Sequence, residues 1–246
     1  MMQTTTIFGL ASLISLVSAH GFITDPAPRM PGTQMAAACG QQVYNNQKAD
    51  NYGNIQGMLQ VANTQTDYDA AKCNIWQCKG YKFEDNTANV HSFTAGQTVS
   101  MKFDVRAPHT GVANISIVDT ATGKTIGDPL KSYTEFASTA SGVKPDETGF
   151  SITIPSDIGS QCSTAGACVI QHYWNAADIN QTYESCYDFT VGGSGSGSSA
   201  PAASSTAVTS AAAAATSTSS AAPAATSSAS GQKCKRHHAR DLSVEH

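Results

Sequence analysis

Apolar and polar side chains alternate between Val99 and Arg106, and this alternation predicts a β-strand with one buried face. Shorter apolar runs that fit further strands follow at residues 112–118, 150–154, 169–174 and 183–191. Turn-forming residues separate these runs, and none of them has the periodicity of a long helix. We therefore predict an all-β domain, an antiparallel β-sandwich.

The region before the first of these strands has a different character. Residues 20–29 are extended and punctuated by proline, and residues 30–89 show no strand pattern. We expect loops and short helices there, with Asp67 as the N-cap of one helix. Residues 119–123 carry the Asp, Thr and Gly of a hairpin turn that follows the strand at 112–118.

The two ends of the chain fall outside the strand pattern. An apolar run too short to span a bilayer precedes the small residues Ser18 and Ala19, which is typical of a secretory signal peptide. Towards the other end, a long stretch of almost only Ser, Ala, Thr and Gly cannot build a core. The predicted organisation is a signal peptide, one folded domain, a disordered linker and a basic disordered tail, over residues 1–19, 20–191, 192–230 and 231–246.

Cysteine usage agrees with secretion. Six cysteines lie inside the predicted domain, an even number that predicts three disulfides in an oxidising compartment: Cys39, Cys73, Cys78, Cys162, Cys168 and Cys186. No Cys-x-x-Cys pair is present, which disfavours a zinc site. Asn114 and Asn180 begin glycosylation sequons. We expect a secreted glycoprotein that is extracellular or associated with the cell wall.

Charge and motifs exclude several classes of function. The formal net charge is −4 and the domain has no basic stripe, so nucleic acid and anionic membranes are poor partners. The sequence has no second apolar span from which a membrane helix would be predicted. Gly-x-Ser-x-Gly, phosphate-binding and His-Glu-x-x-His motifs are missing from the sequence. The carboxylates that a glycosidase would need have no local signature among Asp25, Asp50, Asp67, Glu84 and Asp104.

One histidine stands at the predicted cleavage site. Cleavage after Ala19 gives His20 a free α-amine beside its imidazole, and His109 offers a third nitrogen just beyond a predicted strand. Two imidazoles and an amine suit Cu(II) and tolerate Cu(I). From pattern alone, other interpretations stay open. His109 also fits an ordinary loop histidine, Tyr183 a core residue, and His172 a core histidine on the side of its strand that carries Trp174.

Three short segments occur in a characteristic order. They are His-Gly-Phe-Ile-Thr-Asp-Pro-Ala-Pro-Arg from His20, Val-Arg-Ala-Pro-His-Thr around His109, and Trp-Asn-Ala-Ala-Asp from Trp174, followed by Tyr183. Together they resemble the lytic polysaccharide monooxygenases, in particular the chitin-binding type-4 group. The Gln-Thr-Tyr-Glu-Ser-Cys segment from Gln181 is similar to the ending of the cellulose-active group.

The resemblance implies an immunoglobulin/fibronectin III-like sandwich that holds one copper per mature chain. It implies that His20 and His109 ligate the metal, that Tyr183 lies on its axis, and that His172 and Gln181 orient a bound oxygen species. It also implies a monomeric oxidoreductase that takes electrons from an external donor and cleaves a polysaccharide. Chitin is the first expected substrate and cellulose the second.

Two points remain open. The same histidines also fit a non-catalytic copper-binding or polysaccharide-binding protein of the cell wall. We further predict a Cys39–Cys186 disulfide, which is one of the pairings that six cysteines allow.

Overall fold

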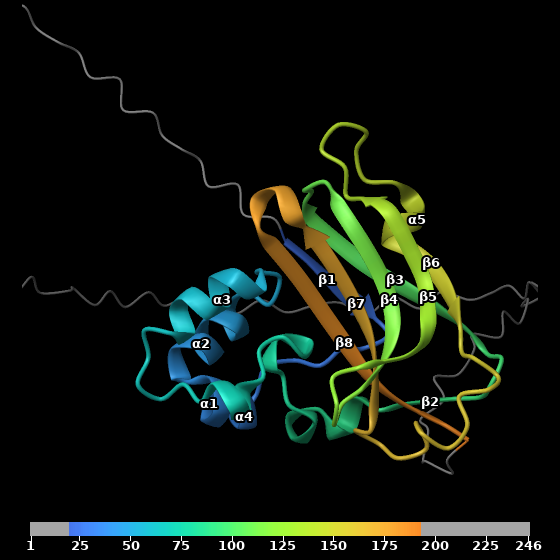
Figure 1. The fold of residues 1–246 in the computed structure, drawn as a ribbon, viewed down its shortest axis with the longest axis horizontal. Coiled ribbons are helices and arrows are strands. Elements are labelled where there is room, and N and C mark those ends of the chain that lie inside the picture. The colour runs from blue at the N-terminus through green and yellow to red at the C-terminus, as the bar shows by residue number, and fades with distance from the viewer. Residues whose placement is uncertain (1–19, 193–246) are drawn as a thin grey trace, which may run out of the picture. The chain divides into compact units, whose positions relative to one another are not determined.

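The computed structural model describes residues 20–192. The predicted signal peptide, the tail and all of the predicted linker except Gly192 lie outside the described residues. The described part contains two β-sheets (Figure 1). Their strands are β1 His20–Asp25, β2 His91–Phe93, β3 Thr98–Ala107, β4 Gly111–Asp119, β5 Thr125–Phe136, β6 Gly149–Thr153, β7 Cys168–Ala176 and β8 Gln181–Val191.

The smaller sheet has the order β1-β3-β6 and the larger one the order β2-β8-β7-β4-β5. The strand predictions of the sequence are confirmed at β3, β4, β6, β7 and β8. All pairs are antiparallel except β2 with β8, which is parallel, so the prediction of a wholly antiparallel sandwich is wrong at this edge. The sequence pattern missed β5 because this edge strand contains Pro129 and exposes most of its side chains.

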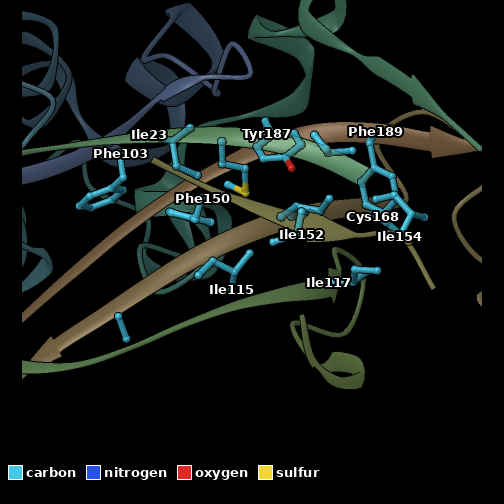
Figure 2. Packing of buried hydrophobic residues seen from close by; sticks show 14 of the residues in the cluster. Ile23, Phe103, Ile115, Ile117, Phe150, Ile152, Ile154, Cys168, Tyr187 and Phe189 are labelled. Carbon is cyan, nitrogen blue, oxygen red and sulfur yellow. The ribbon is translucent and has the colours of Figure 1, made fainter. Parts of the chain in front are cut away.

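The main core fills the space between the two sheets (Figure 2). Alternate residues of β3 supply Val99, Met101 and Phe103, as the periodicity predicts. Figure 2 shows side chains from β1, β4, β6 and β8 pointing into the same space. Labelled members of this cluster are Ile23, Phe103, Ile115, Ile117, Phe150, Ile152, Ile154, Cys168, Tyr187 and Phe189.

Short helices form a second packed region beside β8 (Figure 1). They are α1 Thr33–Cys39, α2 Gln41–Ala49, α3 Ile55–Ala62 and α4 Ala70–Cys73, followed by the 3-10 turns η1 Cys78–Gly80, η2 Phe83–Asp85 and η3 Thr87–Asn89. The helix predicted to begin at Asp67 is capped by Asp69 instead, whose carboxylate accepts the Lys72 N–H at 3.0 Å. Asp67 accepts the Gln41 N–H at the start of α2, since the fold places it beside that helix end. One further helix, α5 Pro145–Thr148, precedes β6.

Strand β8 is buried on both faces, which positions everything that it carries. One face contributes Tyr183, Tyr187 and Phe189 to the main core. The opposite face meets the helical region and its flanking loops, where Thr182 exchanges two hydrogen bonds with Gln56 and Asp188 binds Arg29 at 2.6 Å. Polar contacts thus join β8 to its cover near both ends of this face.

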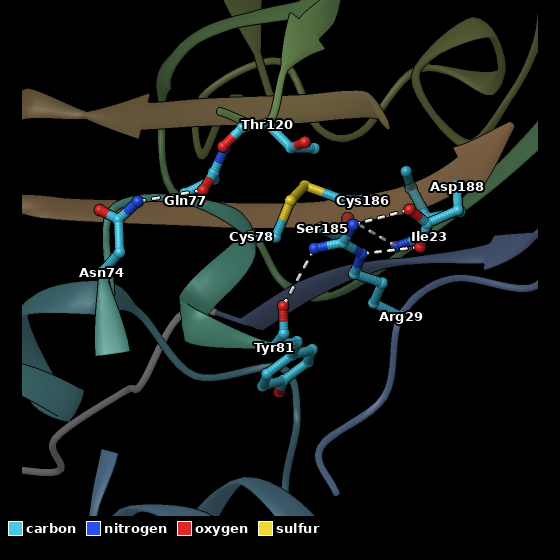
Figure 3. The surroundings of a disulfide bond; sticks show 10 residues. All are labelled: Ile23, Arg29, Asn74, Gln77, Cys78, Tyr81, Thr120, Ser185, Cys186 and Asp188. Atoms are coloured by element: carbon cyan, nitrogen blue, oxygen red, sulfur yellow. Dashed lines mark hydrogen bonds and ion pairs between the residues drawn. A yellow bond between two sulfur atoms is a disulfide. The ribbon is translucent and has the colours of Figure 1, made fainter. Parts of the chain in front are cut away.

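Three disulfides are present in the described residues, as predicted, but the Cys39–Cys186 pairing is wrong. Cys39 ends α1 and bonds Cys73 at the end of α4, because both lie in the core of the helical region. Cys186 bonds Cys78 of η1 instead, and Figure 3 shows this bridge beside the Arg29–Asp188 pair. Cys162 bonds Cys168.

Candidate metal centre

His20 is the first residue of β1, and its position is fixed by strand pairing. The register of β1 on β3 sets His20 opposite Ala107, the last residue of β3. His20 is partly exposed, with 22% of its side chain accessible. The predicted chain start of the mature protein therefore lies at one end of the smaller sheet, where β3 leaves it.

His109 lies in the three-residue connection between Ala107 of β3 and Gly111 of β4. These two strands belong to different sheets, so this connection crosses from one sheet to the other. The Ala107–His20 pairing places His109 only two residues beyond the partner of His20. The structure therefore brings both predicted copper ligands to the same end of the sandwich.

The indole of Trp174 links the two histidine segments. A Cβ atom on Gly21, next to His20, would lie 3.0 Å from Trp174 Cζ3. A Cβ atom on Gly111, two residues after His109, would lie 2.9 Å from Trp174 Nε1. Trp174 is fully buried. Backbone that only glycine allows thus contacts two edges of one indole.

Tyr183 and Gln181 lie together at the start of β8. The Tyr183 ring stacks on Trp174 with centroids 4.5 Å apart, and its hydroxyl donates a hydrogen bond to Gln181 Oε1. Burial raises the pKa of Tyr183, and a hydrogen bond with Asn54 opposes part of this shift. The phenol therefore stays neutral and protonated at physiological pH. Asn54, the N-cap of α3, is a neighbour that the sequence pattern did not reveal.

His172 lies in the main core, the alternative that its strand pattern left open. Its ring stacks on Phe103 with centroids 3.9 Å apart, and burial lowers its pKa to about 3. Neither ring nitrogen has a hydrogen-bond partner among the described residues. Phe103 also packs against the backbone of Gly21, so it separates His172 from the start of β1. This packing gives no support to the predicted oxygen-orienting role of His172, which stays a prediction.

Asp50 is a site neighbour that sequence reasoning missed. Its Oδ2 lies 3.3 Å from His20 Nε2, although the two residues are separated by three proline residues and two helices in the sequence. Asp50 is the C-cap of α2, where no local motif marks it. Only the packing of the helical region against β1 brings this carboxylate to the histidine.

The nitrogen donors at this end of the sandwich fit a copper ion. Within residues 20–192, no three His, Cys, Asp or Glu side chains gather into a metal-binding group. The pair His20 and His109 gives two imidazoles, and the third nitrogen would be the main-chain amine of residue 20 after cleavage. Such a set has no thiolate or carboxylate ligand and suits tetragonal Cu(II). A carboxylate beside the outer nitrogen of a ligating histidine is also usual around protein-bound metals.

Comparison with known sequence families matches residues 20–189 to the family described as lytic polysaccharide mono-oxygenase, cellulose-degrading. The match begins at His20. Comparison with curated proteins gives no match. No helix among residues 20–192 is long and apolar enough to cross a membrane.

Solved structures of such enzymes are similar to this chain at low identity. A Jonesia denitrificans lytic polysaccharide monooxygenase is 17% identical, covering 70% of this chain and 99% of that chain, with a TM-score of 0.34. A catalytic domain from Listeria monocytogenes is 17% identical over 70% of this chain and 99% of that chain, with a TM-score of 0.35. The copper complex of the cellulose-active enzyme CelS2 is 15% identical, covering 71% of this chain and 100% of that chain, with a TM-score of 0.39. Because the family match itself spans more than half of the sequence, the chain belongs to the lytic polysaccharide mono-oxygenase family, a family of copper oxidoreductases.

Proposed function

We propose that the mature protein begins at His20 and is a secreted, monomeric, copper-dependent lytic polysaccharide monooxygenase on an immunoglobulin-like sandwich. The observation that carries this proposal is that the segments carrying His20 and His109 meet at one end of the sandwich, where their neighbours Gly21 and Gly111 both pack against the indole of Trp174. Both histidines are partly exposed in the described chain, so a polymer can approach them. The disulfides agree with an extracellular location.

Each residue has a role that follows from its position. His20 and His109 would hold one copper ion, with the α-amine of His20 as the third nitrogen. Bound copper supplies one-electron redox chemistry with an oxygen co-substrate and an external electron donor. Tyr183 would lie on the inner side of this copper site as a neutral phenol, buried against Trp174. Gln181 orients the Tyr183 hydroxyl by accepting its hydrogen bond.

The substrate proposal is a neutral polysaccharide, cellulose or chitin. The matched family is described as cellulose-degrading, and the Gln181–Tyr183 pair resembles the cellulose-active group. The chitin-binding type-4 resemblance of the segment from His20 favours chitin. One assay on both polymers separates these substrates.

The test uses protein that is correctly processed to His20 and loaded with copper. The protein is incubated with a reductant and, separately, with cellulose or chitin. Mass spectrometry should detect oxidised oligosaccharides from the wild type on at least one of the two polymers and none from His109→Ala. His91→Ala is the matched control, since His91 lies on β2 and bonds the carbonyl of Ala27. Tight copper binding without oxidised products would favour the non-catalytic copper-binding alternative. Binding to chitin that does not depend on copper, without oxidation, would favour a plain polysaccharide-binding module.

A further inference from the structure

The carboxylate of Asp50 lies beside the His20 imidazole. His20 Nε2 and Asp50 Oδ2 are 3.3 Å apart, and both side chains are partly exposed, at 22% and 48%. The other carboxylate oxygen of Asp50 accepts the Tyr52 N–H at 3.0 Å. The two oxygens of Asp50 thus have different partners, one in its own loop and one on β1, which fixes the plane of the carboxylate.

The loop that carries Asp50 is anchored from both sides. The Asp50 N–H closes α2 by donating to the Asn46 carbonyl at 2.8 Å. Lys79, whose side chain is buried, donates from Nζ to the Asn51 carbonyl at 2.5 Å. The Tyr52 hydroxyl donates to Asp104 of β3 at 3.0 Å. A carboxylate on a loop held in this way has little freedom to move away from His20.

The covalent structure of histidine decides which ring nitrogen can bind a metal ion together with the α-amine of the same residue. Nδ1 and the α-amine of the same residue are joined through Cα, Cβ and Cγ, so they close a six-membered ring on one metal ion. Nε2 lies on the far side of the imidazole and cannot join that ring. A neutral imidazole carries one proton, and a carboxylate beside Nε2 favours the form with the proton on Nε2 and a lone pair on Nδ1.

We propose that Asp50 is a positioning residue that accepts the Nε2 proton of His20, fixing the ring orientation and the tautomer that leaves Nδ1 open beside the chain-terminal amine. This inference rests on the proposed function, since it assigns Asp50 a role toward the same copper ion. Lys79 supports it indirectly by anchoring the loop at Asn51.

The test compares Asp50→Ala and Asp50→Asn with the wild type, all processed to His20. Asp128→Ala is the matched control, because Asp128 is exposed on β5 near the opposite end of the large sheet. Nitrogen-15 NMR of the copper-free proteins reports the His20 tautomer directly. We expect the Nδ1-protonated form of His20 to be several-fold more populated in Asp50→Ala, partly restored in Asp50→Asn and unchanged in Asp128→Ala, while the His109 signals stay in place.

Calorimetry and electron paramagnetic resonance with Cu(II) alone give the second readout. Asp50→Ala should bind Cu(II) about 10-fold more weakly and show an altered copper spectrum. Wild-type tautomer populations and wild-type affinity in Asp50→Ala would overturn the role of Asp50 and leave the proposed function intact. Wild-type protein that does not bind Cu(II) at His20 would overturn the proposed function, and the copper-free tautomer measurement would still decide whether Asp50 positions the ring.

Discussion

Tyr183 and Trp174 face each other across β7 and β8, with their rings inclined by 29° and their centroids 4.5 Å apart. The same indole packs against Gly21 and Gly111, in the segments that carry His20 and His109. The segments that carry the histidines are therefore positioned by the buried Trp174, which Tyr183 supports from the other side of the stack. Changes in the backbone around this pair should therefore alter the affinity of the proposed site for copper.

Gly111→Ala tests this coupling. The new Cβ would lie 2.3 Å from the Asn175 carbonyl oxygen and 2.9 Å from Trp174 Nε1, so the start of β4 must shift. We expect copper affinity at least about 10-fold lower, as when the groups that orient metal ligands are lost, and about 1–3 kcal/mol less stability from overpacking. Calorimetry and urea unfolding measure the two effects. Gly149→Ala is the control, since its Cβ would meet nothing closer than 3.9 Å, and equal affinities in the two variants would contradict the coupling.

Acetylation of the His20 amine tests the role of the chain terminus. Protein that begins with N-acetylated His20 has an amide in place of the amine, and the chelate of amine and imidazole is lost, whereas an added glycine would supply a new chelating amine. We expect copper affinity to fall by at least about 10-fold while the unfolding temperature of the copper-free protein stays the same. Calorimetry on matched preparations checks this. Unchanged affinity would mean that the amine is not a ligand.

The pH dependence of stability should contain a contribution from His172. Burial lowers its folded pKa to about 3, below the ordinary value of 6.5, so the unfolded chain takes up the proton first as the pH falls. Stability is therefore lost from about pH 6.5 downward, by about 2 kcal/mol between pH 7 and pH 5 from this residue. In His172→Phe, the slope of the unfolding free energy over this range should decrease by that amount. Urea unfolding of copper-free protein at both pH values measures the difference, and equal slopes would show that His172 is not buried as a neutral ring.

The disulfides should differ in their effect on stability. Cys78–Cys186 closes a sequence separation of 108 residues, whereas Cys162–Cys168 closes only 6. Loop-closure entropy predicts losses of about 5 and about 2 kcal/mol when each pair is replaced by alanine. Urea unfolding of the two double variants compares them. A larger loss for Cys162 and Cys168 would indicate that packing, and not loop length, governs the effect.

Local patterns predicted the strands that have one apolar face, and they failed where neighbours decide. The alternation at Val99, Met101 and Phe103 was sufficient for β3, because that strand has a simple inside and outside. Strand β5 carries Pro129 at the sheet edge and has no such alternation. The pairing of Cys186 depends on where the helical region packs, and no periodicity encodes that placement.

The residues of the candidate site also fall into two groups, those that local motifs predicted and those that only tertiary packing brings to the site. His20, His109, Gln181 and Tyr183 lie in short segments with recognisable order, and the structure brings them to one end of the sandwich in two neighbouring pairs. Asp50 and Asn54 flank these pairs from α2 and α3, where their caps resemble any other helix end. Contacts between segments far apart in sequence arise from tertiary packing, so single-sequence reasoning cannot find them.

The connection that carries His109 leaves the small sheet and enters the large one, while His20 belongs to the small sheet alone. The nitrogens can converge only after the two layers have closed on each other. Under the proposed function, copper uptake is then linked to completed folding, and copper should raise the unfolding temperature in proportion to the logarithm of its free concentration. A chain whose layers are misassembled would remain metal-free, so the proposed redox activity would be confined to correctly folded molecules.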